Sequence, residues 1–115
     1  MEYKCYQPGD EGNIKLELFN SSILYGLDES ITSVWDQNQV IAFLDSHFDE
    51  ATKTLLITAF ETLIKGKGHG KKIITDLKSD GDFRAIIVQP IEESKQFWRK
   101  MGFAPCSEDA WSWER

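Results

Sequence analysis

The sequence predicts an α/β fold in which a mixed, mainly antiparallel central sheet is flanked by helices. Three observations predict this class. Apolar and β-branched runs follow one another over residues 31–63 with only short polar turns between them, which favours antiparallel strands in succession. A glycine-rich loop then leads into a helix-like segment, and another apolar run follows it. A strand–helix–strand connection of this kind is right-handed and joins parallel strands.

The N-terminal third is expected to supply an edge strand and a short helix. Residues 2–7 read as the strand, and the Pro-Gly-Asp turn at residues 8–10 leads to a helix that includes Ile14 and Leu18. Residues 10–27 leave little room for further helices before the next strand, so we expect this region to be short.

The central third is expected to form the hairpin. Residues 31–35 and 40–48 are strand-like and are separated by a polar turn at residues 36–39. A second turn at residues 49–53 leads to a third strand over residues 54–63.

The C-terminal half continues with the crossover. A helix that opens at Gly70 carries the apolar residues Ile73, Ile74 and Leu77, and a turn at residues 79–82 precedes a strand over residues 83–88. A second helix over residues 92–101 is predicted to end at Gly102, and residues 110–113 form a last strand in which Trp111 and Trp113 alternate.

Composition limits the classes of protein to which the chain can belong. With 115 residues, 41% of them hydrophobic, the chain suits one domain over residues 1–115, as a monomer or a homodimer. The net charge of −6 argues against nucleic-acid binding. Cys5 and Cys106 match no metal-ligand spacing and suit free thiols in a cytoplasmic protein, and no apolar run reaches the ~20 residues of a membrane span.

The loop between the third strand and the first helix has the composition of a phosphate cradle. It reads Lys-Gly-Lys-Gly-His-Gly-Lys-Lys over residues 65–72. Unpaired N–H groups and the macrodipole make the first turn of a helix attractive to anions, and glycines let an anion touch backbone. A simpler interpretation of the same residues is a loop that only connects the strand to the helix, with its lysines exposed to solvent.

Three loop types compete for this spacing. A phosphate loop of the Gly-x-x-x-x-Gly-Lys-Ser/Thr type would place Lys65 where glycine belongs and Lys72 where a hydroxyl belongs. A dinucleotide fingerprint would place Lys71 or Ile73 where its third glycine belongs. The third is the Q/R-x-x-G-x-G/A signature of the GNAT superfamily of N-acetyltransferases, which residues 65–70 resemble with Lys65 in place of Gln or Arg.

A second segment strengthens this resemblance. Phe97-Trp98 runs into Lys100-Met101-Gly102-Phe103, which is similar to the helix exit found downstream of the glycine loop in that superfamily. The two motifs occur in the family's order and spacing, and the resemblance is clearest over residues 40–103. Trp98 and Met101, with Ile91, Ser94 and Phe97, also fit one core-facing helical stripe.

The resemblance implies a small GNAT member that transfers acetyl from acetyl-CoA to a primary amine by direct attack. Backbone groups of Thr58, Ala59 and Phe60 would pair with pantetheine, and Trp98 would pack beside the cofactor thiol. The pyrophosphate would be held by the loop residues Lys65, Gly66, Lys67, Gly68, His69, Gly70 and Lys71.

The catalytic residues are less constrained by the resemblance. Many family members carry a tyrosine acid where this chain has Trp98, and an asparagine near the cofactor where it has Ile91. Glu61 is the candidate base, with His47 or a water relay as alternatives. These departures leave open a GNAT-fold CoA-binding or protein-interaction module without catalysis, or a nucleotide-binding module that uses only the loop.

Charge asymmetry suggests the class of acceptor. Residues 1–60 contain ten acidic residues and three lysines, whereas the basic residues gather in the second half. An acidic acceptor side would favour a cationic amine. The alternative is that the excess of acidic residues over residues 1–60 only keeps the protein surface soluble.

Overall fold

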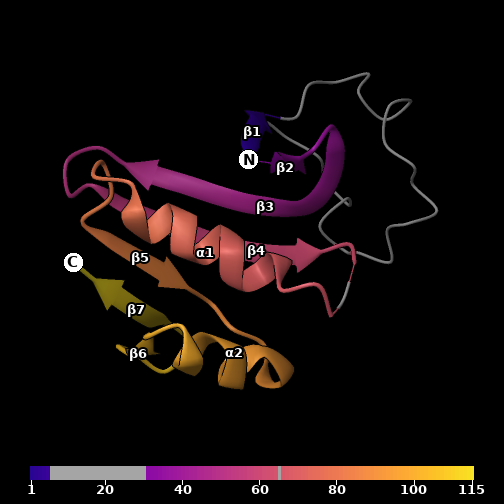
Figure 1. Ribbon diagram of the computed structural model, residues 1–115. Helices are drawn as coiled ribbons and strands as arrows, with labels where there is room; N and C mark the ends of the chain where they lie inside the picture. The colour runs from indigo at the N-terminus through magenta and orange to yellow at the C-terminus, as the bar shows by residue number, and fades with distance from the viewer. Residues whose placement is uncertain (6–30, 65) are drawn as a thin grey trace. The chain divides into compact units, whose positions relative to one another are not determined.

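The computed structural model describes residues 1–5, 31–64 and 66–115 of the chain (Figure 1). The strands are β1 (Glu2–Cys5), β2 (Ile31–Asp36), β3 (Gln39–Asp49), β4 (Thr54–Thr62), β5 (Ala85–Val88), β6 (Ala104–Pro105) and β7 (Trp111–Glu114). The helices are α1 (His69–Ser79), the single 3-10 turn η4 (Glu92–Ser94) and α2 (Lys95–Lys100). Among the described residues, neither α-helix is long and apolar enough to span a membrane.

The strands form one sheet in the order β1-β2-β3-β4-β5-β7-β6. The pair β4–β5 is parallel, whereas β1–β2, β2–β3, β5–β7 and β6–β7 are antiparallel. This confirms the predicted α/β class with a mixed, mainly antiparallel sheet. The predicted helix with Ile14 and Leu18, the end of the first strand and Lys65 lie outside the described residues.

The chain forms two compact units. One consists of Met1–Ser46 and Ala59–Gly70, and the other of His47–Thr58 and Lys71–Arg115. Strands β3 and β4 contribute residues to both units. Whether the chain behaves as one domain stays a prediction.

The first unit is built on the β2–β3 hairpin. Its core is an apolar cluster from these two strands, namely Val34, Ile41, Ala42, Phe43 and Leu44. The turn contains only Gln37 and Asn38, because Asp36 already pairs with Gln39. Both turn residues have positive φ, 52° and 64°, which is the type I′ geometry that matches the twist of a two-residue hairpin. The predicted four-residue turn is therefore two residues too long.

Strand β1 is held on β2 by a small polar group. The Ser33 hydroxyl donates to the carbonyl of Lys4 (3.1 Å) and accepts from the indole N–H of Trp35 (2.9 Å). The Lys4 ammonium lies 4.3 Å from the centre of the Trp35 ring. This group gives the buried serine a partner on each side, as a buried hydroxyl requires.

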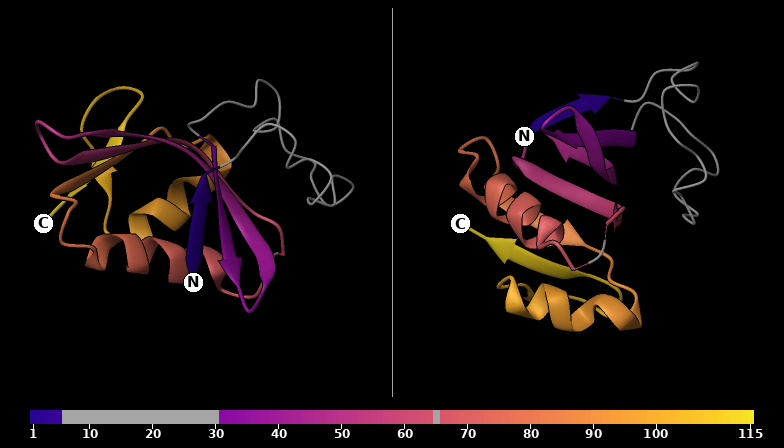
Figure 2. Two further views of the ribbon diagram at one scale, coloured as in Figure 1. Left: turned by 90° about the horizontal axis from the view of Figure 1, so that it is seen from above. Right: turned by 45° about the vertical axis from the view of Figure 1, so that its right-hand side comes forward.

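The second unit contains α1 from Lys71 on, α2 and the strands β5, β7 and β6, whose ribbons are seen from two further sides in Figure 2. Its buried apolar side chains come from every one of its longer elements, namely Leu55, Ile57, Ile73, Ile74, Leu77, Ile86, Val88, Trp98, Met101, Phe103 and Trp111. The Lys78 ammonium of α1 donates to the carbonyl of Met101 (2.7 Å) and lies 5.2 Å from the Trp113 ring centre. The Arg115 guanidinium donates to the carbonyls of Lys78 (2.8 Å) and Asp80 (2.6 Å). The end of α1 is thus fixed against β7.

The end of α2 confirms the predicted glycine stop. Gly102 has φ 91°, the Phe103 amide donates to Trp98 (3.0 Å) and the Gly102 amide donates to Arg99 (3.1 Å). This is the Schellman pattern of a helix C-terminus. The predicted helix over residues 92–101 is divided into η4 and α2, and Ile91 is 68% exposed before it, so Ile91 is not part of a core-facing stripe.

Candidate functional site

The candidate site begins at the second half of β4. Residues Thr54 to Ile57 pair with Ala85 to Val88 of β5. β5 ends at Val88, whereas β4 continues through Thr62. Thr58, Ala59 and Phe60 therefore lie in β4 beyond the segment that pairs with β5, and each is partly exposed. Their predicted role toward pantetheine stays a prediction.

The loop after β4 is anchored at its start and turns sharply further on. The Leu63 amide donates to the carbonyl of Ile41 (2.8 Å), which ties the chain to β3 of the same unit. Gly66 and Gly68 have φ values of 79° and 73°. Glycine is the residue that adopts this left-handed region at little cost.

The space around these glycines is open. Among the residues that the structure describes, a Cβ built on Gly66 or on Gly68 would meet no heavy atom within 4 Å outside the neighbouring residues. Both glycines are also exposed. The backbone at these positions is consequently accessible to a ligand from the loop side, and conformation rather than crowding explains the glycines.

Helix α1 begins at His69, one residue earlier than predicted. Its first turn carries no acidic side chain, whereas Lys67, Lys71 and Lys72 are exposed around it. The unpaired amides of a helix start and the positive end of the helix dipole therefore face no carboxylate from α1's own first turn. The electrostatic conditions for binding an anion are met here.

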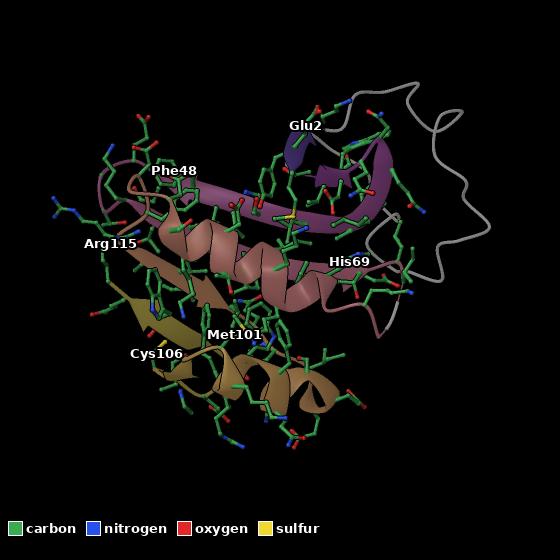
Figure 3. All side chains as sticks on the ribbon, viewed as in Figure 1. Glu2, Phe48, His69, Met101, Cys106 and Arg115 are labelled. Atoms are coloured by element: carbon green, nitrogen blue, oxygen red, sulfur yellow. The ribbon has the colours of Figure 1, made fainter. Side chains whose placement is uncertain are left out.

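His69 adds a polar atom that has no hydrogen-bond partner within residues 1–5, 31–64 and 66–115. Its side chain is partly buried, and Nδ1 is a covered atom without a hydrogen-bond partner among the described residues. Figure 3 labels the residue where the loop enters α1. Buried polar atoms in proteins are nearly always paired, so this atom requires an explanation. The sequence suggests His69 as a donor, but it contains no signal that Nδ1 is covered.

The two candidate bases lie in different units. Glu61 is partly exposed in β4, on the strand face that also carries Leu55 and Ile57 by alternation. His47 is exposed near the end of β3 and belongs to the second unit. Neither position establishes a catalytic role.

Trp98 is a core residue of the second unit. It is 4% exposed, and its ring centre lies 5.0 Å from both the Phe97 and the Phe103 ring centres in edge-to-face contacts. The packing part of its predicted role is confirmed, whereas its contact with a cofactor stays a prediction. Within the described ranges, no group of three or more His, Cys, Asp or Glu side chains could hold a metal ion, and Cys106 is an exposed free thiol.

Comparisons with solved structures identify the fold. No protein-family model matches the sequence, and no curated protein matches it significantly. The Bacillus subtilis N-acetyltransferase YlbP, solved with coenzyme A, matches with a TM-score of 0.68 at 14% identity, over 99% of this chain and 96% of that one. Arabidopsis thaliana Naa50, solved with the bisubstrate analogue CoA-Ac-MVNAL, matches with a TM-score of 0.67 at 12% identity, over 99% and 98%.

A third similar structure has a small-molecule acceptor. The diaminobutyrate acetyltransferase EctA from Paenibacillus lautus, in complex with L-2,4-diaminobutyric acid and coenzyme A, matches with a TM-score of 0.55 at 12% identity, over 96% and 91%. All three proteins are acetyltransferases, and each match extends over nearly the whole of both chains. The chain has the fold of the GNAT N-acetyltransferases.

Proposed function

We propose that this protein is an acetyl-CoA-dependent N-acetyltransferase that acts on a primary amine of a small molecule or protein. One observation carries the proposal. Within an acetyltransferase fold, the loop between β4 and α1 has two left-handed glycines with open space at their backbone. A diphosphate needs this combination of accessible amides and a helix start.

The residues of the loop fit coenzyme A. Gly66 and Gly68 leave backbone accessible, and Lys67 and Lys71 add positive charge. Gly70 adds no side chain to the first turn of α1, and Nδ1 of His69 has no hydrogen-bond partner in the described part of the chain. These residues would hold the pyrophosphate, together with Lys65. The backbone of Thr58, Ala59 and Phe60 would hold the pantetheine arm, because an extended amide chain can pair with the edge of a strand.

When bound, acetyl-CoA supplies an activated acetyl group. The protein has to position this group, accept the proton that the attacking amine loses and allow the departing thiolate to be protonated. The backbone of strand β4 can hold the acetyl group in a fixed position. Holding two reactants in the right geometry can remove a large part of the activation barrier of a bimolecular reaction. Glu61, on this strand and four residues before Lys65, is the proposed acceptor of the amine proton. Trp98 lies in the aromatic packing of the second unit, and its indole is not the proposed proton donor.

We also propose that the acceptor is cationic. Ten acidic residues and three lysines in the first 60 positions create a negative potential that raises the local concentration of cations. Polyamines, aminoglycosides and lysine-rich peptides should therefore be better acceptors than acidic amines. Their advantage should shrink with added salt, because screening acts over about 8 Å at physiological ionic strength.

The experiment is to incubate the protein with acetyl-CoA and a panel of amines while free thiol is followed. Amine-dependent thiol release, with a matching mass increase of the amine, supports the proposal. Equal turnover of an acidic and a cationic amine at low salt would refute the electrostatic selection. A rate of thiol release that is the same with and without amine would refute acetyl transfer to the amine.

A second candidate function is CoA binding without catalysis. The presence of a tryptophan at position 98 favours it, since an indole has no acidic proton to give to a departing thiolate. This candidate predicts tight CoA binding with no amine-dependent thiol release across the whole panel. Replacing Trp98 with Tyr would then create activity, which separates it from an enzyme that lacks only its proper acceptor.

A further inference from the structure

Strand β1 forms one edge of the sheet. It pairs with β2 on one side, and none of the other described strands lies on its outer side. The main-chain N–H and C=O groups of such an edge can pair with a further strand. Proteins commonly protect an edge with charged side chains, and lysine is frequent among them. The charges of β1 therefore decide which strand this edge can accept.

The charges of β1 are complementary to themselves. Glu2 and Lys4 are placed symmetrically about Tyr3, and strand alternation brings both to the same face. Their ion pair within the strand is long, at 3.9 Å, and the two side chains are 71% and 54% exposed. A surface pair of this kind contributes little to the fold, so exchanging it for a pair with another chain costs little.

A second copy of β1 fits this edge in one register. When two copies run antiparallel with Tyr3 opposite Tyr3, Glu2 of each copy faces Lys4 of the other. A slip of two residues in either direction would place Glu2 opposite Glu2 or Lys4 opposite Lys4, and like charges directly opposite each other are destabilising. A slip of one residue would place main-chain groups that point to the other copy opposite groups that point to β2, because these groups alternate along a strand.

The other face of β1 adds apolar contact in the same register. Met1 and Tyr3 are 38% and 36% exposed, and both lie on the face opposite to Glu2 and Lys4. With Tyr3 at the centre, the two tyrosine rings form a cross-strand aromatic pair, which is a favourable combination. Both faces of the strand therefore favour the same pairing.

We infer that the protein associates into a two-fold homodimer through antiparallel pairing of β1 with β1 of a second copy. Main-chain hydrogen bonds supply the attraction, and the two pairs of Glu2 with Lys4 select the register. Two four-residue strands bury much less surface than the ~1,600 Å² of a standard interface, so the dimer should be weak and should form at high micromolar protein concentration. Formation of this dimer does not require the glycine loop to bind coenzyme A.

Exchange of the two charges tests the register. Glu2→Lys gives β1 two positive charges and Lys4→Glu gives it two negative charges, so each variant should repel its own copy and dimerise roughly tenfold more weakly. A protein that combines Glu2→Lys with Lys4→Glu only exchanges the charges and should dimerise like the unsubstituted protein. An equimolar mixture of the two single variants should form a heterodimer, because the two chains are complementary.

A matched control separates the register from net charge. Glu108→Lys lies in the exposed turn between β6 and β7 and changes the net charge by the same amount as Glu2→Lys. It should leave the association unchanged. Circular dichroism checks that each variant is folded.

Sedimentation equilibrium over a range of protein concentrations measures the dimer dissociation constant of each protein. Weaker association of both single variants, with recovery in the doubly substituted protein and in the mixture, supports the inference. A protein that stays monomeric up to millimolar concentration overturns it. A dimer that persists unchanged in both single variants also overturns it, because a different surface would then join the two copies. Failure of both the doubly substituted protein and the mixture to recover the dimer overturns it as well.

Discussion

Gly68 offers the sharpest test of how the loop is built, through its replacement by Ala and by Val. Its φ of 73° lies in the left-handed region, which costs an L-residue about 1–2 kcal/mol. No clash with the described part of the chain adds to this cost, since a Cβ would meet none of its heavy atoms within 4 Å apart from the adjacent residues. We therefore expect Gly68→Ala to lose about 1 kcal/mol of unfolding free energy and Gly68→Val to lose about 2 kcal/mol, because branching at Cβ disfavours the region further.

Urea unfolding measures these differences, and Gly81→Ala is the matched control. Gly81 lies in the turn after α1, has equally open space and has a φ outside the left-handed region. Its replacement should be neutral or should stabilise the protein by about 0.4–1 kcal/mol, because alanine restricts the unfolded chain. CoA should bind Gly68→Val far more weakly than Gly81→Ala, since the new side chain occupies the face of the loop. Equal stability of Gly68→Ala and Gly81→Ala, or equal CoA affinity of Gly68→Val and Gly81→Ala, would refute the reasoning.

Three further predictions concern the rest of the fold. Trp98→Ala should lose roughly 3–5 kcal/mol of unfolding free energy, measured with urea, because a large buried ring that contacts Phe97 and Phe103 is removed. Trp98→Phe should lose much less. A fully stable Trp98→Ala would contradict the placement of α2. Replacing Gln37-Asn38 with Asn-Gly should raise stability by up to about 1 kcal/mol, since these residues accept the left-handed conformation of the type I′ turn more readily; a loss of stability would contradict the turn assignment. The hydrogen bond and the charge of Lys95, whose ammonium lies 2.6 Å from the Glu92 carboxylate, lower the pKa of Glu92 below its usual value. The stability that this pair contributes is therefore present above the unfolded pKa and is lost as pH falls through the folded pKa. Carboxyl NMR titration should show a higher Glu92 pKa in Lys95→Gln, and an unchanged value would contradict the pairing.

The elements with strong local patterns could be predicted from the sequence. The hairpin of β2 and β3 has the alternation and apolar content of strands, and Gly102 has the position of a helix stop. The loop residues 66–71 were identifiable because glycines and lysines were concentrated between a strand pattern and a helix pattern. Short-range physics decides all of these features.

The remaining features depend on contacts between distant parts of the chain. Strand β6 contains only Ala104 and Pro105, which have weak strand propensity and pair because β7 provides an edge. Gln37 takes a positive φ that its own preference opposes, because the two strands fix the hairpin register. The covered Nδ1 of His69 likewise depends on packing that no sequence pattern encodes.

The most direct test of the central claim is the unfolding midpoint of the unsubstituted protein with CoA, ATP and NAD in parallel. A ligand that binds only the folded state at 100 times its dissociation constant adds about 2.7 kcal/mol to the free energy of unfolding. We expect CoA and acetyl-CoA at this excess to raise the midpoint through a stabilisation of this size, with ATP and NAD giving much smaller midpoint shifts at the same concentration. An unchanged midpoint with CoA, together with a rise with ATP or NAD, would contradict the assignment of the loop to coenzyme A.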